Sequence, residues 1–192
     1  MIRLLPFLLV CFAMLAAPVL AENSAADRTD PRVRLQTTMG DIVLELYPAK
    51  APLTVANFLR LVDDGFYDGL IFHRVVANFV IQAGGYDQDL AYREAPATVP
   101  NESFNGLQNR KGTIAMARLD DPDSADTQFF INVHTNLNLN ARPGKPGYTV
   151  FGRVVGGMEV VENIELVDTS IRGGMAGVPE QPVIILHATR AN

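Results

Sequence analysis

The chain has 192 residues, a formal charge of −5 at neutral pH and a single cysteine. This length corresponds to one domain with a sizeable core, and an acidic balance without a basic run argues against nucleic acid as a partner. One cysteine excludes an internal disulfide and a metal site built from cysteines.

The first 21 residues differ in composition from the rest of the chain. Arg3 precedes an apolar run over residues 4–20, and Val19-Leu20-Ala21 provides small residues at its end. A basic start, an apolar stretch and small residues are typical of a secretory signal peptide, so we predict that residues 1–21 are cleaved before Glu22. A retained membrane anchor is the alternative, because the run is close to the ~18 residues of a spanning helix.

The next segment, residues 22–31, is polar and small and predicts a flexible lead-in to a domain over residues 32–192. Residues 33–37 alternate between apolar and polar, residues 39–41 favour a turn, and residues 42–46 alternate again. This pattern predicts a β-hairpin.

Two segments have helical periodicity. Apolar residues recur at helical spacing from Pro52 to Asp64, and Gly65 follows as a signal for the end of a helix. A second helix is expected over residues 157–164, with an apolar stripe formed by Met158, Val161 and Ile164.

Two runs of β-branched and aromatic residues predict a second hairpin. Residues 72–76 and 79–82 are joined by Ala77-Asn78, a two-residue turn signal, and Gly84-Gly85 is expected to end the second strand. Arg74 lies inside the first run, where a guanidinium is costly unless it is paired or faces a groove. Arg74 is therefore a candidate functional residue, and a structural salt bridge to a loop carboxylate is the alternative.

The remaining segments complete an all-β pattern. Residues 86–104 and 120–126 contain proline and scattered charge and are interpreted as surface loops, and residues 182–188 predict a last strand. Many short strands with two helices indicate an antiparallel barrel or sandwich, and the pattern alone does not separate the two.

Four blocks of sequence have a distinctive order. They are FHRVVANFVIQAGG at 72–85, GTIAMAR at 112–118, TQFFIN at 127–132 and YTVFGRV at 148–154. They resemble motifs of the cyclophilin-type peptidyl-prolyl cis-trans isomerases, and the likeness extends from about Val33 to the C-terminus. The chain most resembles the bacterial periplasmic members, which also carry an arginine at the end of the second block.

The resemblance implies a mainly β fold, a closed eight-stranded antiparallel barrel capped by two α-helices. It also implies an isomerase that accelerates rotation about Xaa-Pro bonds and needs no cofactor. Together with the signal peptide, it implies a periplasmic enzyme that assists the folding of exported clients.

Three residues are expected to be catalytic by this resemblance, namely Arg74, Phe79 and Gln82. The reaction breaks no bond, but the partial double bond of the amide imposes a barrier of ~18–20 kcal/mol. The guanidinium of Arg74 keeps its charge at any working pH and would stabilise the twisted amide. Gln82 would orient Arg74 and contact the substrate backbone, and Phe79 would wall the proline pocket.

Eight further positions are expected to contact the substrate by the same match. The proline pocket would be walled by Met116, Phe130 and Leu139. The peptide backbone on either side of the proline would meet Ala117, Arg118 and Gln128. The edge of the site would be formed by His73 and Tyr148. Strand alternation places Phe129 and Phe130 on opposite faces, with Phe129 in the core. The three histidines show no ligand spacing, so no metal site is expected.

One position departs from the family. Asn138 stands where relatives often carry tryptophan or phenylalanine at the pocket rim, and the chain contains no tryptophan. We expect activity to survive, with Leu139 completing the pocket, and cyclosporin to bind weakly.

The expected partners are proline-containing unfolded or flexible polypeptides. We expect a monomer that binds no nucleic acid and does not stay with the membrane after signal cleavage. One alternative is a holdase-like chaperone that recognises proline-containing loops without turnover, and another is an exported barrel that binds a small ligand. The Arg74, Phe79 and Gln82 constellation favours turnover.

Overall fold

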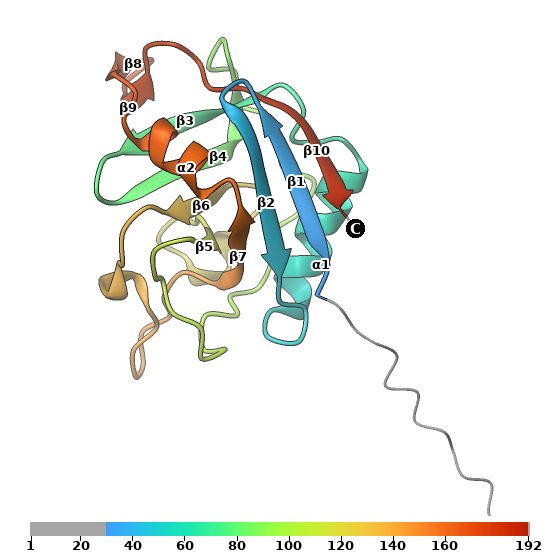
Figure 1. Cartoon of the computed structure of the whole chain (residues 1–192). Coiled ribbons are helices and arrows are strands. Elements are labelled where there is room, and N and C mark those ends of the chain that lie inside the picture. Colours follow the sequence, from blue (N-terminus) through green and yellow to red (C-terminus); the bar gives the residue numbers. More distant parts are fainter. Residues whose placement is uncertain (1–29, 192) are drawn as a thin grey trace, which may run out of the picture.

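The computed structural model describes residues 30–191 and consists of ten strands, two α-helices and two short 3₁₀ helices (Figure 1). The proposed signal peptide and residues 22–29 lie outside the described residues. In chain order the elements are β1 Arg32–Thr37, β2 Gly40–Leu46, α1 Pro52–Asp63, β3 Leu70–Val76, β4 Val80–Asp87, β5 Thr113–Met116, η1 Pro122–Ser124, β6 Phe129–Asn132, η2 Leu137–Leu139, β7 Val150–Gly156, α2 Met158–Glu165, β8 Thr169–Arg172, β9 Met175–Pro179 and β10 Ile185–Ala191.

Eight strands form one antiparallel sheet in the order β10-β1-β2-β7-β5-β6-β4-β3. The sheet curls into an open half-barrel, so the expectation of a closed barrel is wrong. Its edges meet only locally, through a bridge between Ile71 and Ile184 and hydrogen bonds from Phe72 N to Val183 O at 2.9 Å and from Gly69 N to Ile185 O at 2.8 Å. No longer ladder forms, because the contacts between the two edges are confined to residues 183–185, at the start of β10. Strands β8 and β9 form a separate hairpin that the sequence did not predict.

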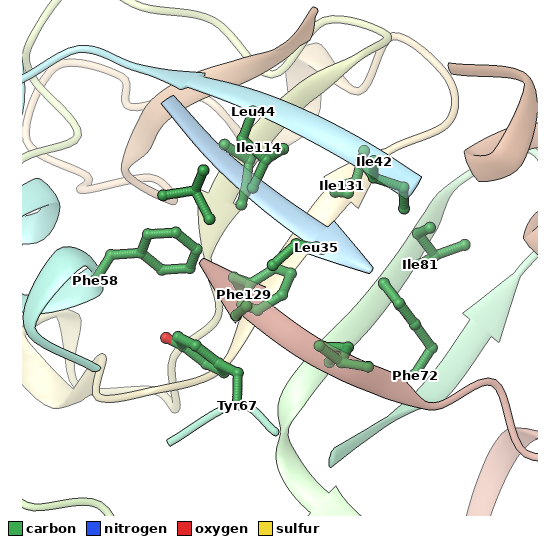
Figure 2. Close-up of a cluster of buried hydrophobic side chains, with 14 of the residues drawn as sticks. Leu35, Ile42, Leu44, Phe58, Tyr67, Phe72, Ile81, Ile114, Phe129 and Ile131 are labelled. Atoms are coloured by element: carbon green, nitrogen blue, oxygen red, sulfur yellow. The ribbon is translucent and has the colours of Figure 1, made fainter. Parts of the chain in front are cut away.

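The main core lies where the alternating strands and α1 face one another. Helix α1 packs near β10, and α2 packs near β2 and β4. Figure 2 shows the aromatic centre of this core, where the ring of Phe58 on α1 lies 5.6 Å from that of Phe129 and 5.2 Å from that of Tyr67. The edge-on contact of Phe58 with Phe129 is a favoured aromatic geometry, so this cluster fixes α1 against β6.

Helix α1 is capped by a residue far away in the sequence. Pro52 suits the first helical turn, but the N-cap residue Ala51 has no side-chain acceptor. The carboxylate of Glu102 instead accepts hydrogen bonds from Leu53 N at 3.1 Å, Thr54 N at 2.8 Å and Thr54 Oγ1 at 2.7 Å. The long loop between β4 and β5 is thereby attached to the helix.

Strand β4 continues past Gly84-Gly85, where the sequence predicted its end. Gly84 has a positive φ of 95°, and a Cβ atom there would lie 2.6 Å from the carbonyl oxygen of Thr127. A Cβ atom at Gly85 would lie 2.8 Å from the side chain of Gln128. The two glycines therefore do not stop the strand but let residues 127–128 pass close to it.

The turn between β3 and β4 is also longer than predicted. Val76 pairs with Val80, so three residues, Ala77, Asn78 and Phe79, form the loop. Asn78 adopts a positive φ of 58°, as asparagine tolerates in turns. Phe79 therefore projects from a turn rather than from a strand.

The two α-helices lie within a residue of their predicted positions. Among the helices of residues 30–191, none combines the length and the hydropathy that a membrane span requires.

Candidate active site

A cavity of about 260 Å³ gathers most of the residues that the sequence singled out. Its lining residues come from β3, β4 and the turn between them, from β6, from the residues after β5 and from the segment between η2 and β7: Arg74, Phe79, Val80, Gln82, Ala117, Arg118, Phe130, Leu139 and Tyr148. Strand register explains the convergence, because Arg74 pairs with Gln82 and Gln82 pairs with Phe130 on the next strand. Directly paired residues project to the same face of a sheet, so these three side chains lie in a row.

The guanidinium of Arg74 is half-buried and has no carboxylate partner. Its Nη1 atom lies 3.5 Å from Gln82 Oε1, and its Cζ atom lies 5.8 Å from the centre of the Phe79 ring. Among residues 30–191, no carboxylate oxygen lies within the 4 Å of a salt bridge to Arg74. The positive charge of Arg74 is thus available to a bound molecule.

Gln82 connects Arg74 to a second glutamine. Its Nε2 atom donates a hydrogen bond of 3.1 Å to Gln128 Oε1, which leaves its Oε1 atom directed to Arg74. Arg74 and Gln82 line this cavity, and Gln128 continues the polar row beyond it.

The apolar part of the lining is separate from the main core. Phe130 belongs to a small buried cluster with Val80, and Phe79, Leu139 and Tyr148 pack against it. The rings of Phe130 and Tyr148 lie 5.7 Å apart. As the alternation along the strand predicts, Phe129 faces the main core on the other side.

Met116 does not line this cavity. Its side chain is only 2 % exposed and belongs to the main core, whereas its neighbour Ala115 faces the small cluster. The alternation of β5 therefore places Met116 on the wrong face for a pocket wall. Val80, which the sequence analysis did not select, occupies the wall instead.

Arg118 holds two loops together. Its guanidinium donates hydrogen bonds to the carbonyl oxygens of Leu119 at 2.7 Å and of Asp120, Pro146 and Gly147 at 3.2 Å each. Its Cζ atom lies 4.8 Å from the centre of the Tyr148 ring. Although Arg118 lines the cavity, its hydrogen-bond donors are largely occupied by the protein.

A second cavity of about 350 Å³ adjoins the first at Gln82, Ala117 and Arg118. Gln128 lines this cavity rather than the first one. At its far side the Tyr92 hydroxyl donates a hydrogen bond of 3.1 Å to Asp126. Burial, together with the charge of Asp126, raises the pKa of Tyr92 to about 12.

His73 lines none of these cavities. Its ring lies 4.8 Å from that of Tyr86, and its buried Nδ1 atom has no hydrogen-bond partner among the described residues. Burial, helped by the charge of Arg74, lowers the pKa of His73 to about 4. His73 is therefore a neutral structural residue at physiological pH.

A buried network of asparagines supports the site from behind. Asn136 Nδ2 donates to the carbonyl oxygen of Phe79 at 2.9 Å and to Asn132 Oδ1 at 2.8 Å. Asn132 Nδ2 in turn donates to Asn109 Oδ1 at 3.1 Å. The network fixes the turn that carries Phe79, and only the final Asn132 of the TQFFIN block pointed to it in the sequence.

In the part of the chain that the structure describes, no group of three or more histidine, cysteine, aspartate or glutamate side chains is arranged to hold a metal ion. The chemistry that the cavity offers is a cationic donor, a row of amides and an apolar wall.

A family model described as "Cyclophilin type peptidyl-prolyl cis-trans isomerase/CLD" matches residues 32–190. The peptidyl-prolyl cis-trans isomerase of Acinetobacter baylyi is 47 % identical over 85 % of this chain and 87 % of its own length. Isomerase cyp18 of Streptomyces antibioticus is 51 % identical over 81 % of this chain and 96 % of its own length. Isomerase B of Escherichia coli is 44 % identical over 82 % of this chain and 98 % of its own length.

Solved structures agree with this match. A cyclophilin-type isomerase of Cryptosporidium parvum superposes with a TM-score of 0.71 at 26 % identity, covering 85 % of this chain and 98 % of the other. The fold is therefore mainly β with two helices, as in that protein. The chain belongs to the family of cyclophilin-type peptidyl-prolyl cis-trans isomerases.

Proposed function

We propose that the protein is a peptidyl-prolyl cis-trans isomerase that accelerates rotation about Xaa-Pro bonds in exported client polypeptides and so assists their folding. The observation that carries the proposal is the guanidinium of Arg74, which has no carboxylate partner in the described chain and stands at a cavity of about 260 Å³ that is apolar on the side of Phe79, Phe130 and Leu139. A proline ring is small and apolar enough for such a cavity.

The mechanism follows from the conjugation that the amide loses when its C–N bond twists. At the top of the barrier the proline nitrogen becomes pyramidal and regains a lone pair, which a cationic N–H donor stabilises. Arg74 supplies that donor, and Gln82, 3.5 Å away, orients it. An acceleration of ~10⁵-fold requires the barrier to fall by only about 7 kcal/mol, so one charge in a water-poor pocket can supply much of it.

The peptide extends on both sides of the proline pocket. The residue before the proline lies toward Ala117 and the loop at 119–127, which border the cavity of about 350 Å³. The polar row of Gln82 and Gln128 offers hydrogen bonds to its backbone. His73 and Met116 contribute by packing rather than by contact with the substrate.

The proposed location is the periplasm. Residues 1–21 act as a signal peptide, and the mature enzyme is a monomer that binds neither nucleic acid nor the membrane. N-terminal sequencing of the protein purified from an osmotic-shock fraction tests this: a chain that begins at Glu22 supports it, and an uncut chain in the membrane fraction contradicts it.

The activity itself is tested by NMR exchange between the cis and trans forms of a short Ala-Pro peptide. We expect the folded protein to accelerate this exchange at catalytic concentrations. If the peptide binds and its exchange is not accelerated, the enzyme proposal fails, and a binding module for proline-containing loops becomes the better account.

A further inference from the structure

A third cavity of about 330 Å³ adjoins the proline pocket, and unlike the cavity of about 350 Å³ it does not reach Gln82 or Ala117. It shares Arg118, Leu139 and Tyr148 with the proline pocket. Since these residues line both, a peptide whose proline fills the pocket can continue directly into the third cavity. An extended chain advances about 3.3–3.6 Å per residue, so the first or second residue after the proline reaches it.

This cavity carries an excess of positive charge on an acidic protein. Arg142 and Lys145 lie on its rim, and both are exposed. They face each other across the tight turn at Pro143-Gly144, where the backbone N–H of each donates to the carbonyl oxygen of the other, at 2.9 Å and 2.8 Å. Residues paired in this way across a hairpin project to the same side.

The charges of this pair are not neutralised within the protein. Over residues 30–191, neither Arg142 nor Lys145 lies within 4 Å of a carboxylate oxygen. Asp120 is the one acidic residue that lines the cavity, and it stands against three basic residues there. The whole chain has a charge of −5, so this concentration of positive charge is local to the site.

We infer that Arg142 and Lys145 select clients that carry an aspartate or glutamate one or two residues after the proline. The inference rests on the proposed isomerase function and names part of its substrate class. The pair acts on specificity only: it attracts the acidic side chain and holds the peptide while Arg74 acts on the Xaa-Pro bond.

The test compares exchange rates in peptides that differ at one position. Each peptide carries glutamate, glutamine or lysine at the first or the second position after a single proline. At low ionic strength we expect kcat/KM for the glutamate peptide to exceed that for the lysine peptide by about 3- to 10-fold at one of these positions, as two exposed ion pairs would give. High salt should reduce this ratio, because it screens exposed charges.

Two double variants identify the source of the preference. Arg142→Gln with Lys145→Gln should bring the ratio of glutamate to lysine close to one. Lys50→Gln with Arg172→Gln changes the net charge equally at residues that line none of the three cavities, and should leave the ratio as in the wild type.

Three results would overturn the inference: equal rates for the three side chains, a preference that survives the loss of Arg142 and Lys145, or a preference for glutamate only before the proline. The glutamine peptides distinguish a failure of the inferred charge preference from a failure of the proposed isomerase function. If the wild type accelerates the exchange of the glutamine peptides, the proposed isomerase function is supported, whichever charged side chain is preferred.

Discussion

At the scale of single residues, the site depends on a charge that the protein leaves without a carboxylate. The guanidinium of Arg74 contacts the amide of Gln82 and the ring of Phe79, and neither of these groups carries a negative charge. Holding an arginine in this way is costly in a partly buried position. Under the proposed mechanism, a bound amide with a developing lone pair would offset this cost, which would account for an arginine inside an otherwise apolar strand.

Asn138 allows a prediction about inhibition. Its side chain borders the basic third cavity and not the proline pocket, so the apolar rim that a tryptophan would provide is missing. We expect cyclosporin to inhibit only above micromolar concentrations and Asn138→Trp to tighten inhibition at least several-fold. Inhibition titrations during peptide exchange measure both, with Asn138→Ala as the matched variant that should not tighten it. Sub-micromolar inhibition of the wild type would contradict this interpretation.

Residue-level reasoning from the sequence succeeded where strand alternation was unambiguous. Phe129 and Phe130 were assigned to opposite faces, as the structure has them. The association of Arg74 with Gln82 was expected from the family resemblance and not from alternation. Met116 was expected to wall the pocket but lies in the main core, because the face to which a residue of a short strand turns depends on register. Register is set by pairing with β6 and β7, which the sequence does not show.

At the scale of secondary-structure elements, a long loop makes contacts that stabilise a helix and the site. The loop between β4 and β5 supplies both the Glu102 cap of α1 and Asn109 of the buried network behind Phe79. The sequence predicted α1 nearly to the residue, but its cap comes from a residue 48 positions beyond Thr54. No local pattern contains such a contact.

The Glu102 cap leads to a prediction about stability. Glu102→Ala removes the acceptor for Leu53 N, Thr54 N and Thr54 Oγ1, so we expect the free energy of unfolding to fall by about 1–2 kcal/mol. Urea unfolding monitored by circular dichroism measures this change. Glu180→Ala, which removes an exposed carboxylate, is the control and should change stability by less than about 0.5 kcal/mol. Equal effects of the two substitutions would show that the cap contributes nothing.

The contacts of Gly84-Gly85 explain why the predicted end of β4 was wrong. Paired glycines usually break strands, but here they let β4 run beneath Thr127 and Gln128 at distances that a side chain would block. Tyr67 Oη then donates to the carbonyl oxygen of Thr127 at 3.0 Å and fixes the crossing segment. The reason for the glycines lies in a segment more than 40 residues away, so composition alone could not reveal it.

At the scale of the whole molecule, two packed clusters lie on either side of the same strands. The main core holds the sheet to α1 and α2, and the small cluster around Phe130 forms the site. The family resemblance led to a closed barrel, yet the edges β3 and β10 meet only around Ile71 and Ile184. Closure depends on how far two edge strands overlap, and hydropathy alternation carries no information on that overlap.

The buried His73 makes global stability depend on pH. Its pKa is about 4 in the fold and 6.5 in the unfolded chain, so between these values the unfolded state binds more protons. The free energy of unfolding should therefore fall as pH decreases from 6.5 to 4, by up to about 3 kcal/mol. Urea unfolding across this range measures the slope. His73→Phe should flatten it, and the exposed His134→Gln should not; equal slopes in wild type and His73→Phe would contradict the assignment.

The most direct test of the account is a paired measurement on Arg74→Ala. Exchange of an Ala-Pro peptide and binding of the same peptide, by chemical-shift titration, are compared with the wild type and with Arg172→Ala as a control outside the site. The account predicts that exchange slows about 10²- to 10³-fold, as for loss of one preorganised donor, while the dissociation constant changes only a few-fold. A variant that retains wild-type exchange would show that Arg74 does not stabilise the twisted amide.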